Sequence, residues 1–600
     1  MIRKGLICLF VLLAALPVAA KKMKSPNGQL KLKTVGQGMQ LSYKGRQVLD
    51  IPVVGFNDGT ATKGIKTIES QTTIKEDYNM LAGKKSHIAN NANEYILRLA
   101  EGVTMRLRLF DDGMAFRYEL QDLKGQRLPE EQTTYRIADG TRRWMMKWSD
   151  GYEGFYPLTT SSEKGRWAFP SLLEPANGTF VLLTEANIGR QQSAASMHAD
   201  DEFFRVVPDK NELNITGQWQ SPWRLAIVGS LVDIVESTLV TDVSEPCKLE
   251  STEWIQPGVV SWVYWAYNHG SNDYNIIKKY VDMAAKLHLP YVLIDAEWDE
   301  MKDGKTVEDA VRYALSQGVK PMIWYNSTTG WINGAPGPKY KLNKPDDRER
   351  DFAWCESIGV AGVKIDFFDG DSQPTMNYCI DLLESAARHH LLINFHGATV
   401  PRGWQRTYPN LLSTEGVYGA EWYNNGPKFT PRAAAHNATL PFTRNIIGPM
   451  DYTPCAFSDS QHPHITTHAH ELALTVLFES ALQHLADRPE SFLSQPQAVQ
   501  DFFGQLPAAW DETRFVSGYP GESVVIARRS GNKWFVAGIN GTEQACDFDL
   551  SRLPSIVGKG RKAECFLDAN EDRAWQLHTS APLPKSVHCR ARGGFVLVIT

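Results

Sequence analysis

Apolar and polar residues alternate along much of the chain between residues 21 and 254. The stretches "GMQLSYKGRQVL", "MRLRLFDDGMAFRYEL" and "TFVLLTEANI" show this alternation, with turns of Gly, Asp and Asn between them. A period of two is typical of strands that bury one face. Long helical patterns are missing from this part of the sequence, so we expect a large antiparallel β-sandwich over 21–254.

The pattern changes after Pro257. Continuous apolar runs such as "GVVSWVYWAY", "YVLID" and "GVKID" now alternate with segments of helical spacing such as "NIIKKYVDMAAKLHL". Apolar strands joined by helices indicate a parallel sheet that is covered on both faces. Six such strands, with room for two more, predict a (β/α)8 TIM barrel over 255–504. No glycine-rich phosphate loop follows a strand, which argues against a dinucleotide fold.

The two ends of the chain differ from the barrel segment. Alternation returns in "SVVIARRSGNKWFVAGIN" and "GGFVLVIT", which predicts a C-terminal antiparallel β-sandwich over 505–600. The first 20 residues combine a charged start, a short apolar run and small residues before Lys21, as in a secretory signal peptide. We therefore expect export across the inner membrane and a periplasmic protein, with no membrane span in the remaining chain.

Composition excludes some classes of function. The formal net charge is −5, so the chain lacks the basic character of a nucleic-acid-binding protein. Seven cysteines follow the predicted signal peptide, scattered and without a C-x-x-C pair, which favours neither a metal cluster nor a disulfide scaffold. Seventeen Trp and 21 Tyr are many, and aromatic faces suit sugar rings as well as large β-rich cores. The oligomeric state is open, with a monomer as our expectation.

Acidic residues recur where the predicted barrel strands end. Catalytic groups of such barrels lie at the carboxyl ends of the strands. These strand ends and the loops after them carry Asp295, Lys364, Asp366, His396, Glu415 and Glu421. Carboxylates with aromatic neighbours, and without a nucleophilic cysteine or a G-x-S-x-G motif, suit glycosidic bond cleavage, which needs one carboxylic acid and one carboxylate. Lys364 points to the same side of its strand as Asp366 and favours the ionised carboxylate there.

Two other clusters of candidate ligands have weaker support. The run D-F-F-D-G-D after Ile365 lacks the D-x-D-x-D-G spacing of a calcium loop, so we interpret Asp369 and Asp371 as turn residues. The histidines at 462, 464, 468 and 470 suggest a zinc hydrolase, but H-E-x-x-H spacing is absent. We expect these histidines to cap and pack the helix that follows.

Several motifs together resemble glycoside hydrolase family 97. They include "GYEGFYPL", "LLTEANI", "GVKIDFF", "INFHGATVPRGWQRTYPN" and "EGVYGAEW". The resemblance spans about residues 25 to 600 and implies an N-terminal β-super-sandwich, a catalytic (β/α)8 barrel and a C-terminal β-sandwich. It also implies an exo-acting, calcium-dependent enzyme that hydrolyses α-glycosides.

The resemblance further implies roles for individual residues. Inverting members carry a glutamate base at the position of Gly397, so this chain resembles the retaining members, which act on α-galactosides. Asp366 then corresponds to the nucleophile and Glu421 to the general acid/base. Asp295, Lys364 and His396 are expected to bind sugar hydroxyls, and Glu185, Glu415 and Glu421 to bind Ca²⁺. A β-L-arabinopyranosidase or an α-glucosidase on the same scaffold stays an alternative, as does a non-catalytic glycan-binding protein.

Overall fold

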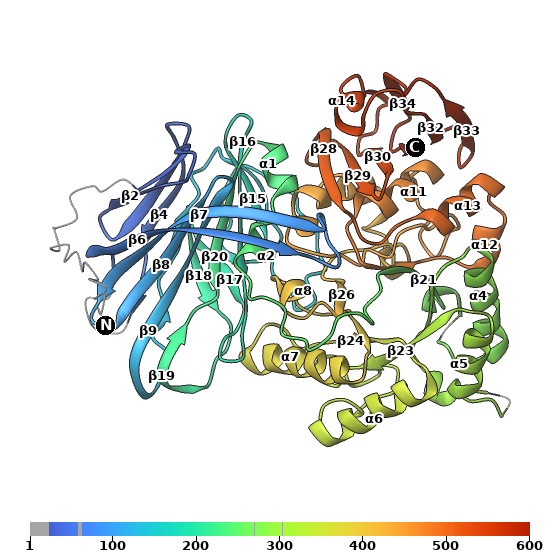
Figure 1. Ribbon diagram of the computed structural model, residues 1–600, viewed down its shortest axis with the longest axis horizontal. Coiled ribbons are helices and arrows are strands. Elements are labelled where there is room, and N and C mark those ends of the chain that lie inside the picture. Colours follow the sequence, from blue (N-terminus) through green and yellow to red (C-terminus); the bar gives the residue numbers. More distant parts are fainter. Residues whose placement is uncertain (1–22, 58–62, 269, 303) are drawn as a thin grey trace, which may run out of the picture.

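The computed structural model describes residues 23–57, 63–268, 270–302 and 304–600. The predicted signal peptide lies outside this range. Figure 1 shows three parts: an N-terminal block of strands, a barrel with helices on its outside, and a smaller C-terminal block that sits on the barrel.

The N-terminal part consists of two large antiparallel sheets. The first runs in the order β1 (Met23–Lys24), β2 (Leu30–Val35), β3 (Gly38–Tyr43), β4 (Arg46–Val53), β11 (Thr134–Arg136), β18 (Phe203–Pro208), β17 (Ala195–Asp200), β14 (Gly165–Trp167). The second runs β13 (Leu158–Thr159), β12 (Arg142–Trp144), β15 (Ser171–Ala176), β16 (Thr179–Ala186), β20 (Trp223–Gly229), β9 (Gly113–Arg127), β8 (Val103–Phe110), β7 (His87–Ala100), β6 (Thr67–Asn79), with β19 (Asn214–Gln220) on β9. In β2 the leucines are buried and the lysines exposed, as period-two alternation predicts.

The central part is a parallel barrel that is nearly closed. Its strands run in the order β26 (Leu411–Thr414), β25 (Leu392–Phe395), β24 (Gly362–Asp366), β23 (Lys320–Asn326), β22 (Tyr291–Ile294), β21 (Gly258–Trp262), β27 (Leu482–Leu485). Helices α4 (Tyr274–Lys286), α5 (Val307–Ser316), α6 (Pro345–Ile358) and α7 (Gln373–Arg388) connect successive strands. Apart from Lys320, every residue of these strands is buried, because helices or loops cover both faces.

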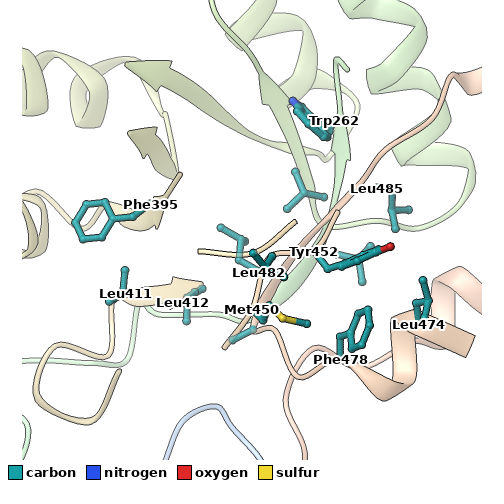
Figure 2. Close-up of a cluster of buried hydrophobic side chains, with 14 of the residues drawn as sticks. Trp262, Phe395, Leu411, Leu412, Met450, Tyr452, Leu474, Phe478, Leu482 and Leu485 are labelled. Carbon is teal, nitrogen blue, oxygen red and sulfur yellow. The ribbon is translucent and has the colours of Figure 1, made fainter. Parts of the chain in front are cut away.

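The described residues form seven barrel strands where the sequence predicted eight. The segment around Asp451 lies between β26 and β27, and its irregular backbone forms no ladder. The Asp451 N–H donates to Thr414 O of β26 (3.1 Å), and the His484 N–H of β27 donates to the Asp451 carboxylate (3.3 Å). Figure 2 shows Met450 and Tyr452 from this segment among apolar side chains of the neighbouring strands. Within the described residues, a single backbone hydrogen bond to β26 and side-chain contacts therefore complete the barrel where no strand ladder forms.

The C-terminal part is antiparallel, as predicted. One sheet runs β28 (Glu512–Tyr519), β29 (Ser523–Ser530), β30 (Lys533–Asn540), β35 (Gly594–Ile599), β32 (Ala563–Asp568), β33 (Trp575–Ser580), and a second pairs β31 (Cys546–Asp549) with β34 (Ser586–Cys589). Strands β30 and β35 pack on α11 (His468–Leu477) of the barrel. The cysteines among the described residues are unpaired. Within the same residues, no helix has the length and apolar character that crossing a membrane requires.

Candidate active site

The predicted rim residues line one pocket. Its volume is about 770 Å³, and it opens at the carboxyl ends of the barrel strands. The polar side chains around it come from strands and loops that are far apart in sequence: Glu153, Asp295, Glu297, Asp299, Glu300, Lys339, Lys364, Asp366, His396, Glu415, Glu421 and Asn425. Four indoles, those of Trp265, Trp324, Trp331 and Trp422, complete the wall. Carboxylates and aromatic rings thus share one enclosed space.

Asp366 ends β24 and is held in place by three neighbours. The Phe367 N–H donates to its Oδ1 (2.9 Å), and the Trp324 indole donates to its Oδ2 (3.2 Å). Lys364 Nζ lies 3.8 Å from the same Oδ2. Burial raises the pKa of Asp366 above its ordinary value, while the charges of Lys364 and His396 act to lower it. The carboxylate is therefore fixed in orientation and its ionised form has two cations close by.

Lys364 also contacts Asp295 at the end of β22. The distance from Lys364 Nζ to Asp295 Oδ2 is 3.3 Å, and the Trp262 indole donates to the same oxygen (2.7 Å). Burial would lower the pKa of Lys364, but Asp295, Glu421 and Asp366 raise it above its ordinary value. The floor of the pocket thus holds a permanent positive charge between two carboxylates.

His396 links two further acids of the pocket to a third acid beneath it. Its Nδ1 lies 3.4 Å from Glu415 Oε1 and 3.5 Å from Glu421 Oε1, and its Nε2 lies 2.8 Å from Asp451 Oδ2. Burial and Lys364 act to lower the pKa of His396, yet Glu415 and Asp451 raise it well above its ordinary value. The imidazole is therefore kept in its charged form, with both nitrogens facing carboxylates.

Glu421 has the environment of a carboxylic acid. The Trp265 indole donates to its Oε2 (2.7 Å), whereas its buried Oε1 has no hydrogen-bond partner among the described residues. Burial raises its pKa to about 7, with a further contribution from Glu415 and opposition from Lys364. Glu415 differs: burial acts to raise its pKa, but His396 and the Gly397 N–H (2.7 Å) lower it below its ordinary value.

Glu153 belongs to this site, although the sequence did not single it out. It comes from a loop of the N-terminal part and accepts a hydrogen bond from the Trp422 indole (2.7 Å). Burial, Glu415, Glu421 and Asp366 together raise its pKa well above its ordinary value. Its motif could have indicated Glu153 as a site residue, because in "GYEGFYPL" an acid stands between aromatic residues in a glycine-containing segment.

Glu185, which the family resemblance assigned to the metal ligands, lies outside the pocket that Glu415 and Glu421 line. Glu185 is fully buried between two guanidinium groups: Arg402 Nε lies 2.7 Å from its Oε1, and Arg224 Nη1 contacts its Oε2. The Ala195 N–H also donates to Oε1 (2.8 Å). Because cations already occupy both oxygens, and Glu185 does not line the pocket with Glu415 and Glu421, it serves as an ion-pair partner between the sandwich and the barrel.

The other two acids of the run D-F-F-D-G-D differ in their surroundings. Asp369 is exposed, as expected for a turn residue. Asp371 lies in a turn but is buried, where it accepts hydrogen bonds from the Tyr152 hydroxyl and from Arg402 Nη2 (3.2 Å). Asp371 is thus a turn residue, as predicted, and its burial follows from partners in distant parts of the chain.

The histidines of this segment pack, as the sequence indicated, but the residue that caps the helix is a threonine. Thr467 caps α11 by accepting from the His470 N–H (3.1 Å). The His470 ring lies between Asn437 (3.0 Å) and the carbonyl of Gly593 (3.2 Å), and His464 pairs with Asp459 (2.9 Å). Among the described residues, the two groups with metal-ligand geometry both include His396 and neither includes these histidines.

The barrel carries paired carboxylates, a lysine and indole rings at the carboxyl ends of its strands. These are the groups that a glycoside hydrolase needs. Family models agree along most of the chain: Glycosyl-hydrolase 97 N-terminal matches residues 23–246, Glycoside hydrolase 97 matches 254–417, and Glycosyl-hydrolase 97 C-terminal, oligomerisation, matches 509–600. The chain belongs to glycoside hydrolase family 97.

Relatives and solved structures extend this result. The chain is 34% identical over 534 residues (85% of this chain, 80% of the relative) to a Streptomyces bingchenggensis protein named "Probable retaining alpha-galactosidase". It is 28% identical over 680 residues (98% and 99%) to "Retaining alpha-galactosidase" of Bacteroides thetaiotaomicron. A crystal structure of a β-arabinopyranosidase matches with a TM-score of 0.87 and 28% identity (96% and 100% coverage). A family 97 enzyme of Pseudoalteromonas sp. strain K8, in complex with acarbose, shares the fold with a TM-score of 0.85 at 22% identity (97% and 100%).

Proposed function

We propose that this enzyme is an exo-acting, retaining α-galactosidase that removes terminal α-galactosides by double displacement. The observation that carries the proposal is the contact between Gly397 and Asp366. A Cβ at position 397 would lie 3.0 Å from Asp366 Oδ1 and 3.0 Å from the Phe367 N–H, and the residue has φ +47°. A glutamate base at 397 and an aspartate at 366 thus compete for the same space. The names of the two curated relatives agree with a retaining enzyme.

In the proposed reaction, Asp366 Oδ attacks the anomeric carbon while Glu421 gives its proton to the departing glycosidic oxygen. This forms a β-galactosyl ester on Asp366 and releases the aglycone as an alcohol. Glu421, now ionised, takes a proton from water, whose oxygen attacks the anomeric carbon and releases Asp366. A pKa of about 7 for Glu421 suits this exchange, because the group must both donate and accept a proton near neutral pH.

The floor of the pocket supplies the proposed contacts to the sugar. Lys364 and Asp295 offer a donor and an acceptor only 3.3 Å apart, which suits two neighbouring hydroxyls. His396, with its charge stabilised by Glu415 and Asp451, offers a third contact from the end of β25, the strand next to β24. Asp295 after β22 and Lys364 on β24 would thereby hold the sugar ring next to Asp366.

Calcium is the cofactor that the family implies, and the residues present fit it. Glu415 and Glu421 offer ligand oxygens within 4.8 Å of one another, Glu153 lines the same pocket near enough for both to raise its pKa, and Glu421 Oε1 lacks a hydrogen-bond partner among the described residues. Carboxylate oxygens are ligands that suit Ca²⁺. We propose that these three carboxylates hold the ion, which when bound would neutralise their repulsion and favour charge on the departing oxygen.

Chelation tests the cofactor. Treatment with a calcium chelator is expected to abolish activity, and Ca²⁺ is expected to restore it better than Mg²⁺, whose octahedral shell suits an all-carboxylate pocket poorly. Glu153→Gln is expected to need more Ca²⁺ for half-maximal activity than the exposed-acid control Glu163→Gln. Activity that persists in excess chelator would contradict the proposal.

The stereochemical course tests the mechanism. Proton NMR of early time points on an aryl α-galactoside is expected to show α-galactose as the first product, followed by mutarotation. β-Galactose as the first product would refute double displacement. Asp366→Asn is expected to lose turnover, which separates enzymatic release from spontaneous hydrolysis.

A β-L-arabinopyranosidase is the second candidate, because a structure of that activity matches at 28% identity over nearly the whole chain. L-Arabinopyranose has the ring configuration of galactose without C6. Comparison of kcat/KM on nitrophenyl α-galactoside, β-L-arabinopyranoside and α-glucoside decides between these activities. We expect the galactoside to have the highest value and the glucoside the lowest.

A further inference from the structure

Trp331 is a large apolar side chain that stays open to solvent. It is 52% exposed and yet lines the catalytic pocket, so it lies where that pocket opens. Single exposed apolar residues are common on protein surfaces and need no explanation. An exposed indole at the entrance of a carbohydrate pocket is different, because its flat face is available to a ligand that extends out of the pocket.

The loop that carries Trp331 is tied to the segment that carries Asp366. The Ser327 N–H donates to Asp366 O (2.8 Å), and the Gly330 N–H donates to Phe367 O (2.9 Å). A Cβ on Gly330 would lie 2.6 Å from Phe367 O, so only glycine allows this approach. The Trp331 ring meets the Phe367 ring edge-on at 4.9 Å. The indole therefore has a fixed position relative to the proposed nucleophile.

The later part of the same loop, up to Tyr340, is also held by hydrogen bonds. The Tyr340 N–H donates to Thr328 Oγ1 (2.8 Å), and the Asn326 N–H donates to Pro338 O (3.1 Å). Lys339 Nζ donates to the carbonyl of Ala335 (2.9 Å). These bonds hold both ends of the loop, so little conformational entropy is lost when a ligand settles on the indole.

Polar groups line the pocket that Trp331 borders. Asp299, Glu300, Lys339 and Asn425 line the same pocket and can exchange hydrogen bonds with hydroxyl groups. A ligand that matches both features has an apolar face and polar edges, as a pyranose ring does. An alkyl or lipid aglycone would leave these polar groups without partners.

We propose that Trp331 is the platform of a leaving-group subsite that takes a second pyranose ring, so that the preferred substrates are α-galactosyl oligosaccharides. The inference rests on the proposed α-galactosidase activity and names the aglycone class of that same site. It assigns to Trp331 a role in binding, and none in the bond-making steps.

Paired substrates with and without a sugar aglycone test the proposal. For Trp331→Ala, kcat/KM on an α-galactosyl disaccharide is expected to fall at least tenfold, about 1.4 kcal/mol, mainly through KM. On α-galactosyl fluoride, which has no ring at the leaving-group position, it is expected to stay within about twofold. Trp331→Phe is expected to recover most of the loss. Tyr340→Ala, which removes a 60% exposed ring from the same loop outside the pocket, is the matched control and is expected to match wild type on both substrates.

Two results would overturn the proposal. An equal loss on the fluoride would mean that Trp331 acts only by supporting Phe367 and Asp366, and unchanged disaccharide kinetics would mean that no sugar rests on it. A wild-type enzyme that hydrolyses neither α-galactoside would instead refute the proposed function. In that case a disaccharide and a glycosyl fluoride of the sugar that the enzyme does cleave replace the two galactosides. The loss of kcat/KM for Trp331→Ala on each of them still decides the role of Trp331.

Discussion

Asp451 concentrates three donors on one buried carboxylate oxygen, so Asp451→Asn perturbs the site without changing its size. Its Oδ2 lies 2.8 Å from His396 Nε2, 2.7 Å from His484 Nδ1 and 2.9 Å from Asn394 Nδ2. Burial alone would raise the pKa of Asp451, but the two histidines hold it far below its ordinary value. The carboxylate is therefore charged throughout the range in which proteins are usually studied.

The size of the effect follows from these contacts. Breaking a buried ion pair by removing one partner costs about 3–5 kcal/mol, because the remaining charge is left uncompensated. Asparagine keeps one acceptor oxygen, so we expect the lower end of this range and a fall in Tm of several degrees. Residues that orient a functional group from behind typically change activity by about 10–100-fold, and we expect kcat/KM to fall by that factor because His396 loses the anchor of its Nε2.

The pH dependence has a definite sign. Folding raises the pKa of His396, so its ion pairs add stability that is complete below about pH 6.5 and disappears only as pH rises through the raised value. Folding lowers the pKa of Asp451, so its contribution is complete above about pH 4 and disappears as pH falls through the lowered value. The difference in stability between wild type and Asp451→Asn should thus persist from about pH 4 to above pH 7.

Thermal unfolding and kcat/KM, both measured from acidic to alkaline pH, check these expectations. Asp369→Asn, on an exposed acid of the loop after β24, is the control and should leave both quantities unchanged. The reasoning is refuted if Asp451→Asn unfolds and turns over like wild type across this range, because the carboxylate would then not be what keeps His396 charged.

Three further substitutions test other parts of the site. Glu421→Gln is expected to lower kcat/KM on disaccharides by about 10²–10⁴-fold and far less on aryl galactosides, whose leaving oxygen needs no proton, and to remove the decline in rate above about pH 7; equal losses on both substrates would count against a proton donor. Glu185→Gln should destabilise the fold by about 3–5 kcal/mol in thermal unfolding with the calcium requirement unchanged, whereas a metal ligand would shift the calcium titration. Gly397→Ala should cost about 1–2 kcal/mol through its left-handed φ and reduce turnover by displacing Asp366, and an active, fully stable variant would show that the loop can move aside.

The sequence predicted those features that depend on local pattern. Asp366, Lys364 and Asp295 stand at the ends of apolar runs, and parallel strands place such ends at one rim, so their shared pocket followed from periodicity alone. The three-part architecture followed in the same way from the change between period-two alternation and helical spacing.

Features that depend on partners far away in the sequence could not be predicted from local pattern. Nothing near Glu185 in the sequence indicates that Arg402, 217 residues later, occupies its carboxylate. Asp451 lies in a segment without strand periodicity, although it takes the position of an eighth strand. Glu153 arises in the sandwich part, where the rule about barrel strand ends does not apply.

The N-terminal part contributes a wall of the reaction chamber, and this limits how the enzyme can be divided. Glu153 reaches into the pocket from that part, and Tyr152 beside it binds Asp371 on the loop after β24. A barrel expressed without the N-terminal part would expose the Arg402 guanidinium and would also lose Glu153, a proposed calcium ligand. Modular exchange of the barrel between relatives should therefore carry residues 145–157 and the loop after β24 together, since neither half retains the chemistry alone.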